Sequence, residues 1–175
     1  MDNDNAILRL GMISRGNLPT VMNLGGEGPV DIEFSLALPR NAVGIPMVRR
    51  VLGDALRSLG VAEECVADIL LAASEACGNA VRHGGPANRY QVTASIGDGR
   101  CDLRVIDKGL GLTTIPERYP PADVENGRGI LIMQAVVDEI SFDTIPGRGT
   151  TVHLSKRLFW EDESADERDR VLAAV

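Results

Sequence analysis

Two polar residues spaced four positions apart are the first candidates for chemistry in this sequence. Glu75 and Asn79 lie in a segment whose apolar residues recur with helical spacing, so a helix would place both side chains on one face, about a turn apart. A carboxylate can act as a base, and an amide oxygen can bind a hard metal ion. A solvent-exposed polar pair is the competing interpretation, and the spacing alone does not exclude it.

Asp107 is a second candidate, because it ends an alternating stretch and opens the sequence Asp-Lys-Gly-Leu-Gly. Gly109 and Gly111 allow a close backbone approach or a positive φ. A carboxylate only accepts hydrogen bonds, so Asp107 could bind the exocyclic amine of adenine and reject guanine, which carries a carbonyl there. The competing interpretation is a simple Asp-x-Gly turn.

Two glycine-rich runs could approach a phosphate or a nucleotide ring. The run Gly127-Arg128-Gly129 precedes an apolar segment, and the free N–H groups and dipole of a helix beginning there would favour a phosphate. An ordinary glycine turn is the alternative. Residues 147–151 predict a hairpin turn, in which Thr150 could place a hydroxyl beside a nucleotide ring. The sequence holds no GxxxxGK[ST] phosphate loop.

Hydrophobic periodicity indicates the elements that position these residues. Residues 31–38 alternate and predict a strand, and two amphipathic helices are expected to end at Gly60 and at His83. Alternation on both sides of residues 97–99 (Gly-Asp-Gly) predicts a hairpin, and a last hairpin is expected around residues 146–149. Residues 130–137 are almost wholly apolar, which does not decide between a buried helix and a buried strand.

The composition excludes several classes of protein. A length of 175 residues indicates about one domain, and only 3% aromatic residues predicts an aliphatic core. The net charge of −7 argues against a direct nucleic-acid partner and against docking on an anionic membrane. No apolar run approaches the roughly 20 residues of a membrane span. Three cysteines without a CxxC motif indicate neither a disulfide framework nor a zinc site, so a reducing, cytoplasmic location is expected. Cys65 and Cys77 are predicted to be core thiols.

The distribution of glycine and charge suggests one domain with two flanking segments. We expect residues 1–30 to form an irregular N-terminal arm, residues 31–158 to form the folded domain, and residues 159–175 to form an acidic C-terminal tail. Residues 161–170 hold six acids and two bases, which contribute −4 to the net charge. Most of the acidity is therefore assigned to the tail.

The order of the candidate motifs resembles that of a known family. Read in sequence, EACGNAVRHG, DKGLG, GRGI and GRGTT resemble the four boxes of the histidine-kinase-like (GHKL, Bergerat-fold) ATPases, over roughly residues 31–157. Within that superfamily the compact chain looks like the anti-sigma-factor serine/threonine kinases. The resemblance implies an α+β fold, a two-layer α/β sandwich whose mixed, mainly antiparallel sheet is covered on one face by helices. It also implies that residues 130–137 form a helix.

The resemblance implies a role for each candidate residue. Asn79 should bind a Mg²⁺ ion that bridges the phosphates of ATP, and Glu75 should be the general base toward a serine or threonine hydroxyl. Asp107 should bind the adenine amine with help from Thr150. Ring packing, lid movement and phosphate contact are implied for the glycines of the two middle boxes and one arginine: Gly109, Gly111, Gly127, Arg128 and Gly129.

The family also implies partners and a regulatory role. The partners are a sigma factor and an anti-anti-sigma protein of the STAS type, Arg49 or Arg50 is the candidate at the partner surface, and a homodimer is implied. We therefore expect an ATP-binding anti-sigma factor that phosphorylates its antagonist and regulates transcription by partner switching. The segment between Gly111 and Gly127 is short and lacks lysine. Two alternatives stay open: a nucleotide-gated binding module with little kinase activity, and a detached domain that phosphorylates histidine in trans.

Overall fold

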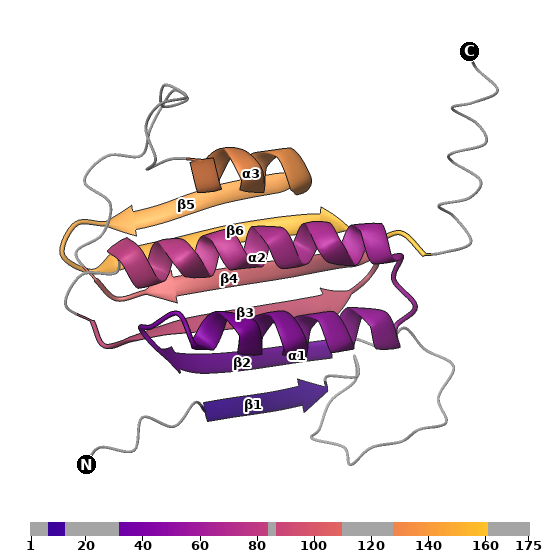
Figure 1. Cartoon of the computed structure of the whole chain (residues 1–175), viewed down its shortest axis with the longest axis horizontal. Helices are drawn as coiled ribbons and strands as arrows, with labels where there is room; N and C mark the ends of the chain where they lie inside the picture. Colours follow the sequence, from indigo (N-terminus) through magenta and orange to yellow (C-terminus); the bar gives the residue numbers. More distant parts are fainter. Residues whose placement is uncertain (1–6, 13–31, 84–86, 110–127, 161–175) are drawn as a thin grey trace.

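A single antiparallel sheet with three helices on one face forms the domain (Figure 1). The structure is a computed structural model that describes residues 7–12, 32–83, 87–109 and 128–160. The six strands are ordered β1-β2-β3-β4-β6-β5. In chain order the elements are β1 (Ile7–Met12), β2 (Ile32–Pro39), α1 (Gly44–Ser58), α2 (Glu63–His83), β3 (Arg89–Gly97), β4 (Arg100–Asp107), α3 (Arg128–Val136), β5 (Glu139–Ile145) and β6 (Gly149–Arg157).

The expected two-layer α+β fold is confirmed, with one correction to the sheet. Every strand pair is antiparallel, so the parallel pairing of a mixed sheet does not occur among the described strands. The physical reason is the position of β6. The crossover through α3 makes β4 and β5 run in the same direction, but β6 lies between them and pairs with both. The two parallel strands are therefore never neighbours.

The helix and hairpin predictions are confirmed. Helix α1 is followed by Gly60 at φ 72°, α2 ends at His83, and the ambiguous apolar segment forms α3. Asp98 and Gly99 both have positive φ, as a type I′ hairpin turn requires. The core between the sheet and the helices is aliphatic, and its fully buried side chains include Leu36, Leu38, Leu52, Leu56, Val66, Val92, Ile96 and Met133.

All three cysteines are buried free thiols, which confirms the prediction for Cys65 and Cys77 and adds Cys101 to the core. Desolvation raises the pKa of Cys77 and of Cys101 to about 12, and burial also raises the pKa of Cys65. These thiols stay protonated and pack as small apolar side chains.

Both ends of the expected domain differ from the prediction. The segment 1–30, expected to be irregular, contains β1, which pairs with the edge of β2. The run Ile-Leu-Arg-Leu-Gly-Met is short and lies in a Gly- and Asn-rich segment, so its pattern did not predict a strand. At the other end, the Trp160 Nε1–H donates to the carbonyl of Leu59 at 3.2 Å, and Phe159 accepts the N–H of Ala62 at 2.8 Å. The first two residues of the expected tail therefore pack on the domain, and residues 161–175 lie outside the described part.

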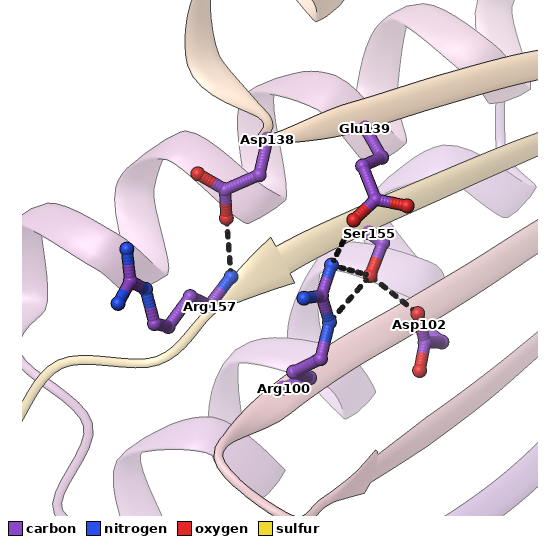
Figure 2. A network of polar contacts seen from close by, with 6 residues as sticks. All are labelled: Arg100, Asp102, Asp138, Glu139, Ser155 and Arg157. Atoms are coloured by element: carbon purple, nitrogen blue, oxygen red, sulfur yellow. Dashed lines mark hydrogen bonds and ion pairs between the residues drawn. The ribbon is translucent and has the colours of Figure 1, made fainter.

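A polar network on the helix-free face fixes β5 against the centre of the sheet (Figure 2). Arg100 Nη2 pairs with Glu139 Oε1 at 2.8 Å, and the Arg100 guanidinium also donates to Ser155 Oγ. The Ser155 hydroxyl in turn donates to Asp102 Oδ1. Three strands are tied together in this way, so β5 has a fixed position at the edge of the sheet.

Three further contacts lie at the end of α3 that leads into β5. Asp138 Oδ2 accepts the N–H of Arg157 (Figure 2). On the helix side, Lys156 Nζ donates to the Val136 carbonyl at 2.7 Å and pairs with Asp68 Oδ2 at 2.9 Å. A cation at the last carbonyl of a helix is favourable. With its C-terminal end anchored, α3 projects its N-terminal end toward α2. No helix in the described ranges combines the length and apolar character that crossing a bilayer would need.

Candidate functional site

Glu75 and Asn79 lie where the N-terminal end of α3 meets α2. Gly129, in the first turn of α3, faces both side chains: a Cβ at this position would lie 2.6 Å from Glu75 Oε2 and 3.6 Å from Asn79 Oδ1. The Glu75 side chain is only 24% exposed. The pair is therefore only partly exposed, because another element of the fold packs against it.

This meeting point suits a phosphate group bound together with a divalent cation. The first N–H groups of α3 have no partner within the helix and carry the positive end of its dipole. Asn79 Oδ1, a hard oxygen donor, lies within reach of that end of the helix. No cluster of three acidic, histidine or cysteine ligands occurs in the described residues. The donor set fits Mg²⁺, which usually takes one or two protein ligands and completes its shell with phosphates and water.

Asp107 lies at the end of β4, opposite Tyr90 on β3 and Thr150 on β6. Its Oδ1 accepts the N–H of Gly109 at 2.9 Å, so the Asp-x-Gly turn exists as the simpler interpretation predicted. The turn and the adenine role are compatible, because a carboxylate has a second oxygen with its own acceptor sites. Fixing Oδ1 in the turn gives Oδ2 a defined orientation.

Gly149 brings the last hairpin against Asp107. Its φ is 108°, and a Cβ there would lie 2.0 Å from the carbonyl oxygen of Asp107. No side chain fits such a distance, so glycine is required at this position. The next residue, Thr150, is 6% exposed, and its Oγ1 lies 3.3 Å from Thr144 Oγ1. The closing motif therefore places a threonine hydroxyl beside Asp107.

Tyr90, the residue opposite Asp107 on β3, borders this end of the site. Tyr90 is buried, and its hydroxyl has no hydrogen-bond partner in the described part of the chain. Burial raises the pKa of Tyr90 well above its usual range, so the phenol is neutral at physiological pH. A Cβ on Gly44 would lie 3.0 Å from this hydroxyl.

The remaining nucleotide-site residues are only partly described. Gly109 is buried after β4, and Arg128 is the exposed first residue of α3. Gly111 and Gly127 lie outside the described residues, and so does the segment between them. Their expected roles in lid movement and phosphate contact stay predictions.

Arg82 is a residue of the site that the sequence reasoning missed. Its Nη2 lies 3.4 Å from Asn79 Oδ1 and 4.0 Å from Glu75 Oε2, and its Nε–H donates to the Gly78 carbonyl at 3.2 Å. The available signal was its position three residues after Asn79 and seven after Glu75, which is the same helix face.

The two candidate partner-binding arginines differ in their surroundings. Arg49 Nη1 donates to the Leu70 carbonyl at 3.1 Å and to Ser74 Oγ at 2.8 Å, so this side chain joins α1 to α2. The Arg50 side chain is 85% exposed, and its contact with Asp54 is long, at 3.9 Å. Both arginines are exposed, and Arg50 is the one whose side chain is not held against α2 by a hydrogen bond in the described residues.

Two exposed apolar side chains precede Arg50 at helical spacing, one at the N-cap of α1 and one in its first turn. Val43 is 78% exposed and Met47 is 43% exposed. Their spacing of four and then three residues to Arg50 gives one stripe along the helix. We call Val43, Met47 and Arg50 the α1 stripe.

Comparisons with known proteins agree with this geometry. A sequence model of the family described as histidine kinase-like ATPase domain matches residues 38–156. The anti-sigma F factor of Bacillus licheniformis is 36% identical over 101 residues, which span 52% of this chain and 68% of that protein. The anti-sigma F factor of Bacillus subtilis (strain 168) is 30% identical over 141 residues, or 75% of this chain and 94% of that protein.

A solved structure is also similar. The crystal structure of the RsbU and RsbW domains of a Mycobacterium tuberculosis protein superposes with a TM-score of 0.55 and 27% identity. The similar region covers 71% of this chain and 32% of that longer chain. The residues matched by the family include five that line the candidate site on α2, β4, α3 and β6: Glu75, Asn79, Asp107, Gly129 and Thr150.

Proposed function

From the membership of this chain in the histidine kinase-like ATPase domain family and, within it, in the anti-sigma-factor kinases, we propose its function. The protein is an ATP-dependent serine/threonine kinase that is also an anti-sigma factor. Its substrate is an antagonist of the STAS type. The observation that carries the proposal is the approach of Gly129 to Glu75 and Asn79, which joins a candidate base, a cation ligand and a helix N-terminus at one point.

ATP binding uses the two ends of the site. Asp107 Oδ2 accepts a hydrogen bond from the adenine amine, with Thr150 beside it. The phosphates lie at the N-terminal end of α3, where Gly129 leaves room for a close approach. Asn79 would hold a Mg²⁺ ion, whose charge would offset part of the phosphate charge. The domain family implies ATP binding, and these residue assignments are our inference from the geometry.

Phosphoryl transfer requires a base beside the phosphates, and we assign that role to Glu75. Glu75 accepts the proton of a serine or threonine hydroxyl while the hydroxyl oxygen bonds to the γ-phosphorus. The bond between that phosphorus and the bridging oxygen breaks, and ADP leaves. The half-buried position of Glu75 against α3 keeps it close to the phosphates but open to a substrate side chain.

Partner binding is assigned to the α1 stripe. The stripe combines two exposed apolar side chains with a well-exposed cation, a composition that suits a protein partner. Arg49 connects the same helix to Ser74, the residue directly before Glu75. Arg49 therefore links the helix that carries the stripe to the helix that carries Glu75. A sigma factor and the antagonist would compete for this surface, and the homodimer stays a prediction.

The central experiment measures ATP binding and phosphoryl transfer separately. Titration calorimetry with and without Mg²⁺ should give cation-dependent ATP binding, and Asn79→Ala should weaken it. Transfer from γ-labelled ATP to a STAS-type protein should produce an acid-stable phosphoserine or phosphothreonine. Glu75→Gln should leave ATP binding nearly intact and slow transfer by ~10²–10⁴-fold, the usual contribution of a general base.

The outcomes separate the alternatives. Unchanged transfer by Glu75→Gln would remove the base role, and an acid-labile product would point to histidine phosphorylation instead. The absence of lysine between Gly111 and Gly127 favours a second candidate, a binding module whose partner affinity depends on ATP. ATP-dependent capture of a sigma factor without any phosphoprotein product would support that module. Arg104→Gln, on the helix-free face of β4, is the control for all these measurements.

A further inference from the structure

We propose that Lys156 is a positioning residue for the nucleotide site, because it sets the register in which α3 lies along α2. This inference rests on the proposed function, since it concerns what holds the N-terminal end of α3 opposite Glu75 and Asn79. Lys156 lies on β6, and its contacts are with the last residue of α3 and with α2. It therefore acts on the site through α3.

The two helices run antiparallel and meet at two points with matched spacing. At the N-terminal end of α3, Gly129 lies against Glu75. At the other end, Lys156 Nζ donates to the Val136 carbonyl at 2.7 Å and pairs with Asp68 Oδ2 at 2.9 Å, so it bridges α3 and α2. Val136 follows Gly129 by seven residues. Asp68 precedes Glu75 by the same number, so the two points are about 10 Å apart along either helix.

The contacts of Lys156 are directional, whereas the packing of α3 on its neighbours is not. Met133 is the one buried residue of α3, and a flexible apolar side chain fits several neighbouring positions. Asp138, just after the helix, is bonded to β6 through its N–H and its carboxylate, which ties the departing chain to the sheet. Lys156 joins the helix end to α2 as well, and a hydrogen bond tolerates little change in distance.

The burial of this cation opposes a change of register. The Lys156 side chain is 13% exposed, and a buried cation is costly to desolvate unless it is paired. Lys156 has both a carboxylate and a helix carbonyl as acceptors, and a cation is favourable at the last carbonyls of a helix. Moving α3 along α2 by one residue, about 1.5 Å, would break one of these bonds.

The register matters at the opposite end of α3, where the phosphates are proposed to lie. Phosphate binding there depends on the first N–H groups of α3, next to Glu75. A displacement of about 1 Å near a reacting group can cost about 100-fold in rate. The adenine end does not depend on α3, because Asp107 belongs to β4 and Thr150 to the start of β6. Lys156 should therefore affect phosphate contacts and spare adenine contacts.

This difference gives the test. Mg-ATP and adenosine should be titrated by calorimetry into the full chain and its variants, below the unfolding temperature measured for each. We expect Lys156→Met to weaken Mg-ATP binding by about 10-fold or more, the usual effect of losing charge-assisted hydrogen bonds, and to leave adenosine binding nearly unchanged. Lys156→Arg keeps a cation with several donors, so it should recover much of the Mg-ATP affinity.

A milder variant keeps the test available if Lys156→Met does not fold. Asp68→Asn breaks the ion pair but leaves the bond from Lys156 to the Val136 carbonyl. Asp68 is 35% exposed, so the change should cost little stability. It should give a smaller loss of Mg-ATP affinity, again without a loss of adenosine affinity.

Arg57→Met is the matched control. It removes the ion pair between Arg57 and Glu63, at 2.6 Å, which joins α1 to the first turn of α2 without involving α3. Its ratio of Mg-ATP to adenosine affinity should equal that of the wild type. An equal fall of this ratio in Arg57→Met would overturn the inference, because any loosening of α2 would then weaken phosphate binding.

The remaining outcomes separate the inference from the proposed function. A folded Lys156→Met with the wild-type ratio of affinities would overturn the inference and leave the proposed function intact. A wild-type chain that binds Mg-ATP no better than adenosine would overturn both.

Discussion

Gly129 lies so close to Glu75 that a methyl group on the glycine would come within 2.6 Å of the carboxylate oxygen Oε2. The two residues are far apart in the sequence, and the packing of α3 on α2 brings them together. The absence of a side chain at Gly129 therefore leaves the space that the Glu75 carboxylate occupies. Any side chain at position 129 must displace either Glu75 or the N-terminal end of α3.

Gly129→Ala should therefore separate activity from stability. Alanine is better than glycine in a helix by ~1 kcal/mol, and the group it meets is the end of a flexible side chain, so the free energy of unfolding should be unchanged or slightly higher. The displaced Glu75 should lower the rate of phosphoryl transfer by at least about 10-fold. Urea denaturation and a transfer assay on the same protein measure the two quantities. A fully active Gly129→Ala would show that Glu75 does not work from this position.

Asp107→Asn should change base selectivity more than it changes folding. The asparagine oxygen can still accept the N–H of Gly109, so the turn is preserved. Its amide presents a donor where the carboxylate presents an acceptor, so the adenine amine loses its partner and a guanine carbonyl gains one. We expect ATP affinity to fall by about 10-fold or more, and the ratio of ATP to GTP affinity to fall with it. Competition binding of both nucleotides measures this ratio, and an unchanged ratio would place adenine elsewhere.

The sequence predicts the elements of this site but not their contacts. The periodicities that place Glu75 and Asn79 on a helix, and Asp107 at a strand end, depend on local spacing and are confirmed. The segment 130–137 is almost wholly apolar, so it has no hydrophobic periodicity that could identify a helix. The prediction that it is helical came from the family resemblance. Its approach to α2 is set by tertiary packing, which local spacing does not encode.

The features that the sequence did not predict share a physical cause. Strand β1 is short and pairs with the edge strand β2. Its strand conformation depends on that pairing, which the local sequence does not encode. The position of β6 between β4 and β5 is a property of the sheet topology, and the spacing of apolar residues in the sequence does not reveal it. Arg82 is an exposed cation on a helix, which by pattern is an ordinary solvated residue. Only its distance from Asn79 and Glu75 distinguishes it.

The buried thiols predict a loss of stability at high pH. Desolvation raises the pKa of Cys77 and of Cys101 to about 12 in the folded protein, whereas an unfolded thiol titrates near ~8.5. Between these values the unfolded chain loses protons that the folded chain keeps, so the free energy of unfolding is maintained below about pH 8.5 and falls as pH rises toward 12. Each thiol can contribute up to ~1.4 kcal/mol per pH unit.

Urea denaturation at several pH values between 7 and 11 measures this slope. Cys101→Ala should unfold more easily at pH 7 because it leaves a small cavity, but its slope above pH 9 should be shallower than that of the wild type, since one titrating thiol is gone. Burial also raises the pKa of Tyr90, which adds to the slope in the same direction. A pH-independent stability between 9 and 11 would contradict the burial of these groups.

Gly149 and Gly147 form a matched pair that tests the closing hairpin. Both have positive φ, at 108° and 76°, so alanine at either position costs about 1–2 kcal/mol of backbone strain. Only at Gly149 does a Cβ also meet backbone, 2.0 Å from the Asp107 carbonyl oxygen, whereas the space around Gly147 is open. We expect Gly147→Ala to lower the free energy of unfolding by that strain alone and to keep ATP affinity. Gly149→Ala should lose clearly more stability and should weaken ATP binding, because the clash pushes the end of β4 and Asp107 away from Thr150. Urea denaturation and calorimetry on the two variants give the comparison, and equal losses at both positions would mean that the two strands do not approach as closely as described.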